Sequence, residues 1–179
     1  MIKINMGCGK RNFGKDWIHI DGGNYSHLDS HDITKIPYGD NSVDLIYASH
    51  VLEYFNREEA IAILKEWKRV LKPGGMLRLA VPNFKIIAEL YISQGYDLES
   101  FLGPLYGEMN MRNSTIYHTT CYDYKSLKNL LISIEFCDVV YYDWKNTCHS
   151  NFDDHSQSYI PHMDKGNGTL ISLNVECKK

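Results

Sequence analysis

The chain has 179 residues, enough for one domain with a hydrophobic core and too few for two. It is 44% hydrophobic and 23% charged, as in an ordinary globular protein, and its net charge of -3 argues against a nucleic-acid partner. No apolar run approaches the length of a membrane span. The five cysteines are odd in number, irregularly spaced and form no CxxC pair, which argues against a disulfide framework. The spacing of Cys148-His149, Asp154-His155 and His162 fits no standard zinc pattern. We therefore expect a single domain over residues 1–179, located in the cytoplasm because no signal-peptide h-region is seen.

The N-terminal stretch predicts a short buried strand, Ile2 to Met6, that ends in the glycine turn Gly7-Cys8-Gly9. Glycine lacks a Cβ, so the backbone can turn sharply and a ligand can approach it closely. A second strand over 17–21 ends on an acid, and a very short third strand is predicted near Leu28. The connections between these strands are too short for full crossover helices.

The middle of the chain predicts strand, helix and strand in that order. Residues 43–48 form the clearest buried strand. Asn56 can cap the following helix, and Glu59 can complete a capping box. Pro73-Gly74-Gly75 ends the helix, and residues 76–81 form the next strand. This pattern is typical of a parallel α/β sheet.

The second half begins with an insertion over residues 84–122, which should hold two helices and a polar segment over 109–120, where a substrate lid would lie. Asp123 can cap a further helix. The strands predicted over 138–144 and 169–177 have no helix between them, so they should pair antiparallel. The expected fold is therefore α/β, with a mostly parallel sheet and an antiparallel last strand.

Four motifs in this order resemble those of the class I S-adenosylmethionine-dependent methyltransferases, and especially the small group labelled simply as predicted methyltransferases. The motifs cover roughly the first half of the chain; they are Asn5-Met6-Gly7-Cys8-Gly9, Asp21, Asp32-Ile33 ahead of Pro37-Tyr38 and 42–46, and Leu71-Lys72-Pro73-Gly74-Gly75 before a strand ending Val81-Pro82-Asn83. The resemblance implies a Rossmann-like domain that binds S-adenosylmethionine and releases S-adenosylhomocysteine. The dinucleotide fingerprint Gly-x-Gly-x-x-Gly does not fit, because Asn12 stands at its third glycine.

The same resemblance implies which residues hold the cofactor. The glycine turn and Gly22 would approach the amino-acid end and the ribose, and Asp21 would accept hydrogen bonds from the ribose hydroxyls. Asp32 and the backbone of Ile33 would hold the adenine amino group. The predicted set is Gly7, Cys8, Gly9, Asp21, Gly22, Asp32, Ile33, Ser49 and His50. Cys8 is interpreted as a small spacer in the turn and not as a nucleophile.

Methyl transfer needs alignment of donor and acceptor, and in some reactions a base that takes a proton from the acceptor. His50 follows a strand at the expected mouth of the site, so it is the first candidate for the base. A role as a turn cap or as a contact to the cofactor is an equally weighted alternative. Glu53 and His118 are further candidates, each weighed against an ordinary surface position. His155 and His162 are interpreted as loop histidines, with a role toward substrate as the lesser alternative.

These observations predict a methyltransferase that acts on a small or medium-sized metabolite. Two alternatives stay open: a subunit or sensor that binds S-adenosylmethionine without catalysis, and a nicotinamide-dependent oxidoreductase. Because the early crossovers lack helices, one sheet face should be thinly covered, either by loops and aromatic side chains or by a second subunit in a homodimer.

Overall fold

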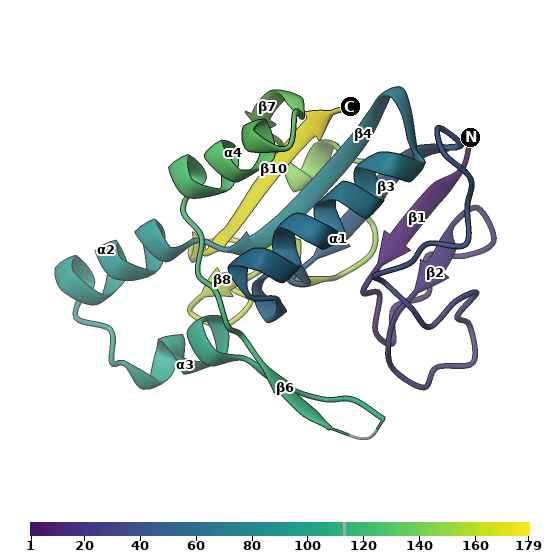
Figure 1. The fold of residues 1–179 in the computed structure, drawn as a ribbon. Helices are drawn as coiled ribbons and strands as arrows, with labels where there is room; N and C mark the ends of the chain where they lie inside the picture. The colour runs from purple at the N-terminus through teal and green to yellow at the C-terminus, as the bar shows by residue number, and fades with distance from the viewer. Residues whose placement is uncertain (113) are drawn as a thin grey trace.

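The centre of the fold is a six-stranded sheet with the order β2-β1-β3-β4-β10-β7 (Figure 1). This computed structural model describes residues 1–112 and 114–179. The strands are β1 (Lys3–Met6), β2 (Ile18–Ile20), β3 (Val43–Ser49), β4 (Leu71–Pro82), β7 (Cys137–Tyr141) and β10 (Ser172–Lys178). The first four pair parallel, and β10 runs antiparallel between β4 and β7. The predicted α/β class with an antiparallel last strand is confirmed.

Two amphipathic helices cover one face of the sheet, α1 (Arg57–Val70) and α4 (Tyr124–Ser133) (Figure 1). The predicted capping box of α1 is present: Asn56 Oδ1 accepts from the N–H of Glu59 at 3.0 Å, and Glu59 Oε2 accepts from the N–H of Asn56 at 2.9 Å. Asp123 caps α4 in the same way. The buried stripe of α1 consists of Ala60, Ile63, Leu64, Trp67 and Val70. Local caps and apolar spacing therefore fix both helices where the sequence predicts them.

The opposite face of the sheet is covered by loops and aromatic side chains, which is one of the two predicted arrangements. Phe13 from the loop before β2 stacks on Phe152 from the loop after β7, with ring centroids 4.2 Å apart. His149 of the later loop stacks on Tyr47 of β3 at 3.9 Å. The face that motivated the homodimer hypothesis is thus filled by the chain itself.

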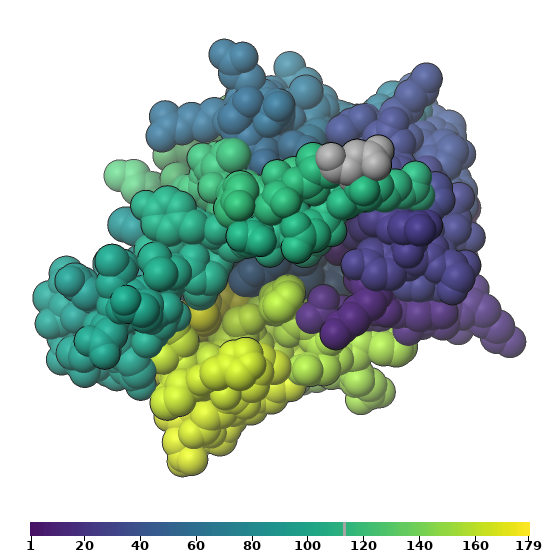
Figure 2. Space-filling view, turned by 90° about the horizontal axis from the view of Figure 1, so that it is seen from below, coloured from purple at the N-terminus to yellow at the C-terminus, as the bar shows by residue number. Residues whose placement is uncertain are grey.

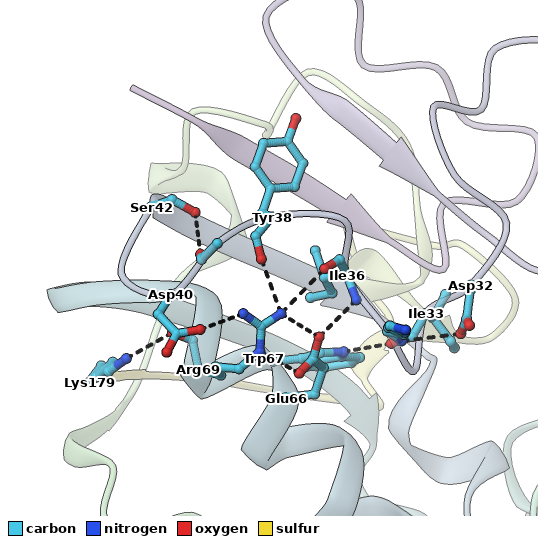
Figure 3. A network of polar contacts seen from close by, with 12 residues as sticks. Asp32, Ile33, Ile36, Tyr38, Asp40, Ser42, Glu66, Trp67, Arg69 and Lys179 are labelled. Carbon is cyan, nitrogen blue, oxygen red and sulfur yellow. Dashed lines mark hydrogen bonds and ion pairs between the residues drawn. The ribbon is translucent and has the colours of Figure 1, made fainter.

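The predicted third strand is reduced to a single parallel bridge between Ile20 and Ser30. The segment after it is held by side chains instead of a sheet ladder. Arg69 of α1 donates to the carbonyls of Ile36 and Tyr38, and the indole of Trp67 donates to the carbonyl of Ile33 at 3.0 Å (Figure 3). Residues 32–40 are therefore fixed on α1.

The insertion over 84–122 contains the two expected helices, α2 (Phe84–Gln94) and α3 (Glu99–Tyr106). Its polar part is a hairpin of β5 (Glu108–Asn110) and β6 (Thr115–Tyr117), which projects from the body in Figure 1. The hairpin crosses one end of the molecule toward the N-terminal segments in Figure 2, with a hollow between it and the segment that contains β8 (Tyr159–Ile160) and β9 (Thr169–Leu170). Across the described ranges, no helix is both long and apolar enough to cross a membrane.

Candidate active site

The glycine turn after β1 requires glycine at two positions, for different reasons. Gly7 and Gly9 have φ of 64° and 54°, in the left-handed region that glycine tolerates best. A Cβ on Gly7 would lie 2.2 Å from Cγ2 of Val51, whereas nothing lies within 4 Å of a Cβ on Gly9. Gly7 is needed for packing, and Gly9 borders open space where a ligand can approach.

Asp21 joins this turn to the end of β2. Its side chain is buried, and Oδ2 accepts a hydrogen bond from the N–H of Gly9 at 2.8 Å while Oδ1 accepts from the N–H of Gly23 at 2.6 Å. A carboxylate has about four acceptor sites, so both oxygens can accept further hydrogen bonds. Asp21 can therefore hold the shape of the turn and also accept hydrogen bonds from hydroxyl groups of a ligand.

A small cavity lies against the glycine turn, and we call it the turn cavity. It is about 50 Å³ in volume and is lined by Gly7, Asp21, Gly22, Ile33, His50, Val51, Tyr54, Phe55, Met109, Met111 and Ile116. The last three belong to the segment of the β5–β6 hairpin. Cε of Met111 lies 2.6 Å from the position of a Cβ on Gly22. Ligand pockets usually occupy roughly 300–1,000 Å³, so a nucleoside enters only if the hairpin side chains move outward.

A larger cavity of about 630 Å³ opens on the other side of His50, and we call it the main cavity. Helix α3, the start of the hairpin and the loop around β8 surround it; its lining includes His50, Tyr54, Tyr96, Met109, His118, His155, Tyr159 and His162. The two cavities share three lining residues: His50, Tyr54 and Met109. A ligand in the turn cavity and a second ligand in the main cavity would therefore meet at these side chains.

Beside His50 lies a buried carboxyl group, Glu53, whose side chain is 1% exposed. Its Oε1 is 3.3 Å from Nδ1 of His50 and 3.8 Å from Nε2 of His118, but neither oxygen has a hydrogen-bond partner. Burial raises the pKa of Glu53 to about 8. Burial also lowers the pKa of His118, and it lowers the pKa of His50 well below its usual value, with His155 and His118 adding to the effect.

These pKa directions decide the charge of the group. At neutral pH, Glu53 is mostly a protonated acid and both imidazoles are neutral, so the short distances are not ion pairs. A buried pair without hydrogen bonds lacks the contacts that stabilise charge, so burial keeps the three groups neutral. His50, Glu53 and His118, the three predicted catalytic candidates, thus lie together in one uncharged cluster.

Four predicted cofactor residues line neither cavity, namely Gly9, discussed above, and Cys8, Asp32 and Ser49. Asp32 is exposed and its Oδ1 accepts hydrogen bonds from the N–H and hydroxyl of Thr34, which lower its pKa. Ser49 donates to Asp154 at 3.3 Å. Cys8 is buried, and desolvation raises the pKa of its thiol to about 12, which suits the predicted spacer. The cofactor roles expected of Asp32 and Ser49 stay predictions.

Some lining residues were not singled out from the sequence, namely Tyr54, Met109 and Met111. Tyr54 follows His50 by four residues, on η1 (Leu52–Tyr54), a spacing that returns it to the same mouth. The two loop histidines His155 and His162 do line the main cavity.

Within residues 1–112 and 114–179, no group of three or more His, Cys, Asp or Glu side chains could hold a metal ion.

The sequence of the chain is similar to those of known methyltransferases. Residues 6–79 match the family model described as a methyltransferase domain. A demethylmenaquinone methyltransferase of Staphylococcus epidermidis is 30% identical over 121 residues, covering 61% of this chain and 46% of that protein. A ubiquinone/menaquinone biosynthesis C-methyltransferase, UbiE, of Blochmanniella floridana is 30% identical over 115 residues, covering 60% and 44%. The chain thus spans less than half the length of these relatives.

Solved structures share the fold over 99% of the chain. A SAM-dependent methyltransferase of Methanosarcina mazei superposes with a TM-score of 0.60 at 18% identity, covering 99% of this chain and 92% of that chain. The 1,6-didemethyltoxoflavin-N1-methyltransferase of Burkholderia thailandensis, solved with 1,6-didemethyltoxoflavin and S-adenosylhomocysteine, gives 0.57 at 11% identity, covering 99% and 70%. At these identities the similarity establishes the fold alone.

Proposed function

We propose that the chain is a class I S-adenosylmethionine-dependent methyltransferase and that it transfers a methyl group to a small or medium-sized metabolite. The observation that carries the proposal is the meeting of the two cavities at His50, Tyr54 and Met109. Methyl transfer requires donor and acceptor to be held in contact and in line. A donor against the glycine turn and an acceptor in the main cavity satisfy that requirement.

S-adenosylmethionine supplies a methyl group already activated by a sulfonium centre. The open space beside Gly9, the acceptor sites of Asp21 and the surfaces of Gly22 and Ile33 fit a ligand with an amino-acid end, a ribose and a base. These residues would hold the cofactor after the hairpin side chains Met109 and Met111 shift outward.

His50 is the group we assign to proton removal from the acceptor. It borders both cavities, and its lowered pKa keeps it neutral, so that it can accept a proton at pH 7. Glu53 lies 3.3 Å from its Nδ1, and His118 lines the main cavity beside the same carboxyl group, so both act on His50 by position. An acceptor that needs no deprotonation would use the same residues for alignment only.

The main cavity favours an uncharged acceptor. Glu108 is the one formally charged side chain in its lining, within the described part of the chain, and the imidazoles of His50, His118 and His155 are neutral at pH 7. A phosphate or a nucleic acid would need Lys or Arg there. The names of the curated relatives, quinone-biosynthesis methyltransferases, are in keeping with an uncharged ring as acceptor.

Location of the protein in the cytoplasm stays a prediction.

Calorimetric titration tests the proposal directly. We expect micromolar binding of S-adenosylmethionine and S-adenosylhomocysteine, and no binding of NAD. Binding of NAD alone would replace the proposal by an oxidoreductase. Cofactor binding with no methyl transfer to a panel of hydroquinones, phenols and N-heterocycles would favour the non-catalytic alternative, whereas methyl transfer that His50→Gln lowers at unchanged cofactor affinity would support catalysis.

A further inference from the structure

A buried hydrogen-bonded chain leads from His50 into β10. Nε2 of His50 lies 3.3 Å from Oγ of Ser172, and this hydroxyl lies 2.9 Å from Oδ1 of Asn174. Nδ2 of Asn174 donates to the carbonyl oxygen of Ser156 at 2.8 Å. Ser172 and Asn174 are each 4% exposed, so water does not compete for these contacts.

The direction of every hydrogen bond in this chain follows from its last member. A main-chain carbonyl can only accept, so the amide group of Asn174 must point its NH₂ at Ser156 and its oxygen at Ser172. The single hydroxyl proton of Ser172 is then donated to Asn174. The oxygen of Ser172 can therefore only accept from His50, which places a proton on Nε2.

A neutral imidazole carries one N–H, so Nδ1 of His50 must hold a free lone pair. That nitrogen is the one that lies 3.3 Å from the buried Glu53. His118 is oriented in a related manner, because its Nδ1 lies 3.0 Å from the carbonyl oxygen of Pro104 and must donate to it. Both histidines thus turn an unprotonated nitrogen toward the same carboxyl group.

We propose that Ser172 and Asn174 are positioning residues that hold His50 as the Nε2–H tautomer, so that Nδ1, beside Glu53, is the basic nitrogen of the site. The inference rests on the proposed function for the role of His50 as a base, but the tautomer itself is independent of turnover. The inference also gives β10 a role in the site. This antiparallel strand places Ser172 against His50, which directly follows β3.

Two-bond ¹H–¹⁵N correlation of ¹⁵N-histidine-labelled protein at pH 7.5 tests the assignment, with His50→Gln identifying the signals. We expect the Nε2–H pattern in the wild type. Ser172→Ala removes the acceptor and should shift the population toward Nδ1–H, while Ser172→Thr retains the hydroxyl and should restore the wild-type pattern. Asn174→Leu frees the hydroxyl of Ser172 to donate, so it should shift the tautomer in the same direction. Ser133→Ala, at an exposed serine of α4, is the matched control.

An Nδ1–H pattern in the wild type overturns the proposal, as does an unchanged Nε2–H pattern in folded Ser172→Ala. If Ser172→Ala does not fold, the wild-type spectrum and Asn174→Leu decide. Titration of the same samples with S-adenosylhomocysteine separates the two hypotheses. Failure of the wild type to bind it counts against the methyltransferase proposal alone, whereas a wrong tautomer with intact binding counts against the positioning residues alone.

Discussion

The carboxyl group of Asp21 accepts a hydrogen bond from the main-chain N–H of Gly9 at 2.8 Å, which ties the end of β2 to the turn after β1. The same carboxyl group holds Gly23 through its other oxygen. One buried acid thereby fixes the two loops that border the turn cavity. Its removal should affect both the shape of the turn and the contacts to a ribose.

Asp21→Ala is therefore expected to weaken binding of S-adenosylhomocysteine by about 1–3 kcal/mol, because a charged acceptor of hydrogen bonds is lost. Calorimetric titration measures the change. Asp16→Ala is the matched control, since Asp16 is an exposed acid just before β2, away from the turn cavity. Equal affinity of Asp21→Ala and the wild type would show that the carboxyl group does not contact the cofactor.

Alanine substitution should separate the roles of the two glycines. Gly7→Ala places a Cβ 2.2 Å from Val51 and should lower the free energy of unfolding by about 2–4 kcal/mol, through overpacking and a left-handed φ. Gly9→Ala meets no atom within 4 Å and should lower it by about 1–2 kcal/mol, while it weakens cofactor binding. Urea unfolding and calorimetry measure the two effects. Full cofactor affinity in Gly9→Ala would place the ligand elsewhere.

Glu53→Gln should alter how stability depends on pH. The folded-state pKa of Glu53, about 8, is above the ordinary value of 4.5, so folding retains a proton that the unfolded chain loses. The contribution of this group is present below about pH 4.5 and is lost as the pH rises toward 8. Glutamine cannot ionise, so the variant should gain about 1–3 kcal/mol relative to the wild type between pH 5 and pH 8.

Urea unfolding of both proteins at pH 5, 6, 7 and 8 checks this prediction. The lowered pKa values of His50 and His118 have the opposite effect, since neutral histidines lose stability as the pH falls, but both proteins contain them. The difference between the two proteins therefore isolates Glu53. A difference that stays constant across this range would mean that Glu53 is ionised in the folded protein.

Arg69→Lys should loosen the segment over 32–40. Arg69 donates to Asp40, to both oxygens of Glu66 and to the carbonyls of Ile36 and Tyr38, a set that the planar guanidinium can satisfy and an ammonium cannot (Figure 3). We expect a loss of about 1–2 kcal/mol in the free energy of unfolding. Arg57→Lys, at an exposed position of the same helix, should change it by less than about 0.5 kcal/mol. Equal effects of the two variants would contradict the role of this network.

The sequence by itself determined the order of the strands of the central sheet and of helices α1 to α4, because the signals for them are local. It did not predict the β5–β6 hairpin or the β8–β9 pair, and it placed a strand near Leu28 where the structure has only a bridge. The capping box of Asn56 and Glu59, the cap at Asp123 and the alternation in residues 43–48 each specify a structure within a few residues. The missing helix between the first two strands was likewise determined by the length of the connection. The glycine turn and Asp21 were found because they follow strands whose carboxyl ends share one edge of a parallel sheet.

Tertiary structure decided which polar side chains meet. Asp32 accepts a hydrogen bond from its near neighbour Thr34, whereas Ser49 donates to Asp154, which is distant in the sequence. Neither Asp32 nor Ser49 lines a cavity. His118 approaches Glu53, and Ser172 approaches His50, only because the hairpin segment and β10 pack beside η1 and β3. Neither approach has a periodic signal in the sequence. The protonation states and tautomers of the site depend on these long-range contacts, because burial and hydrogen-bond partners, and not residue type, set the pKa values.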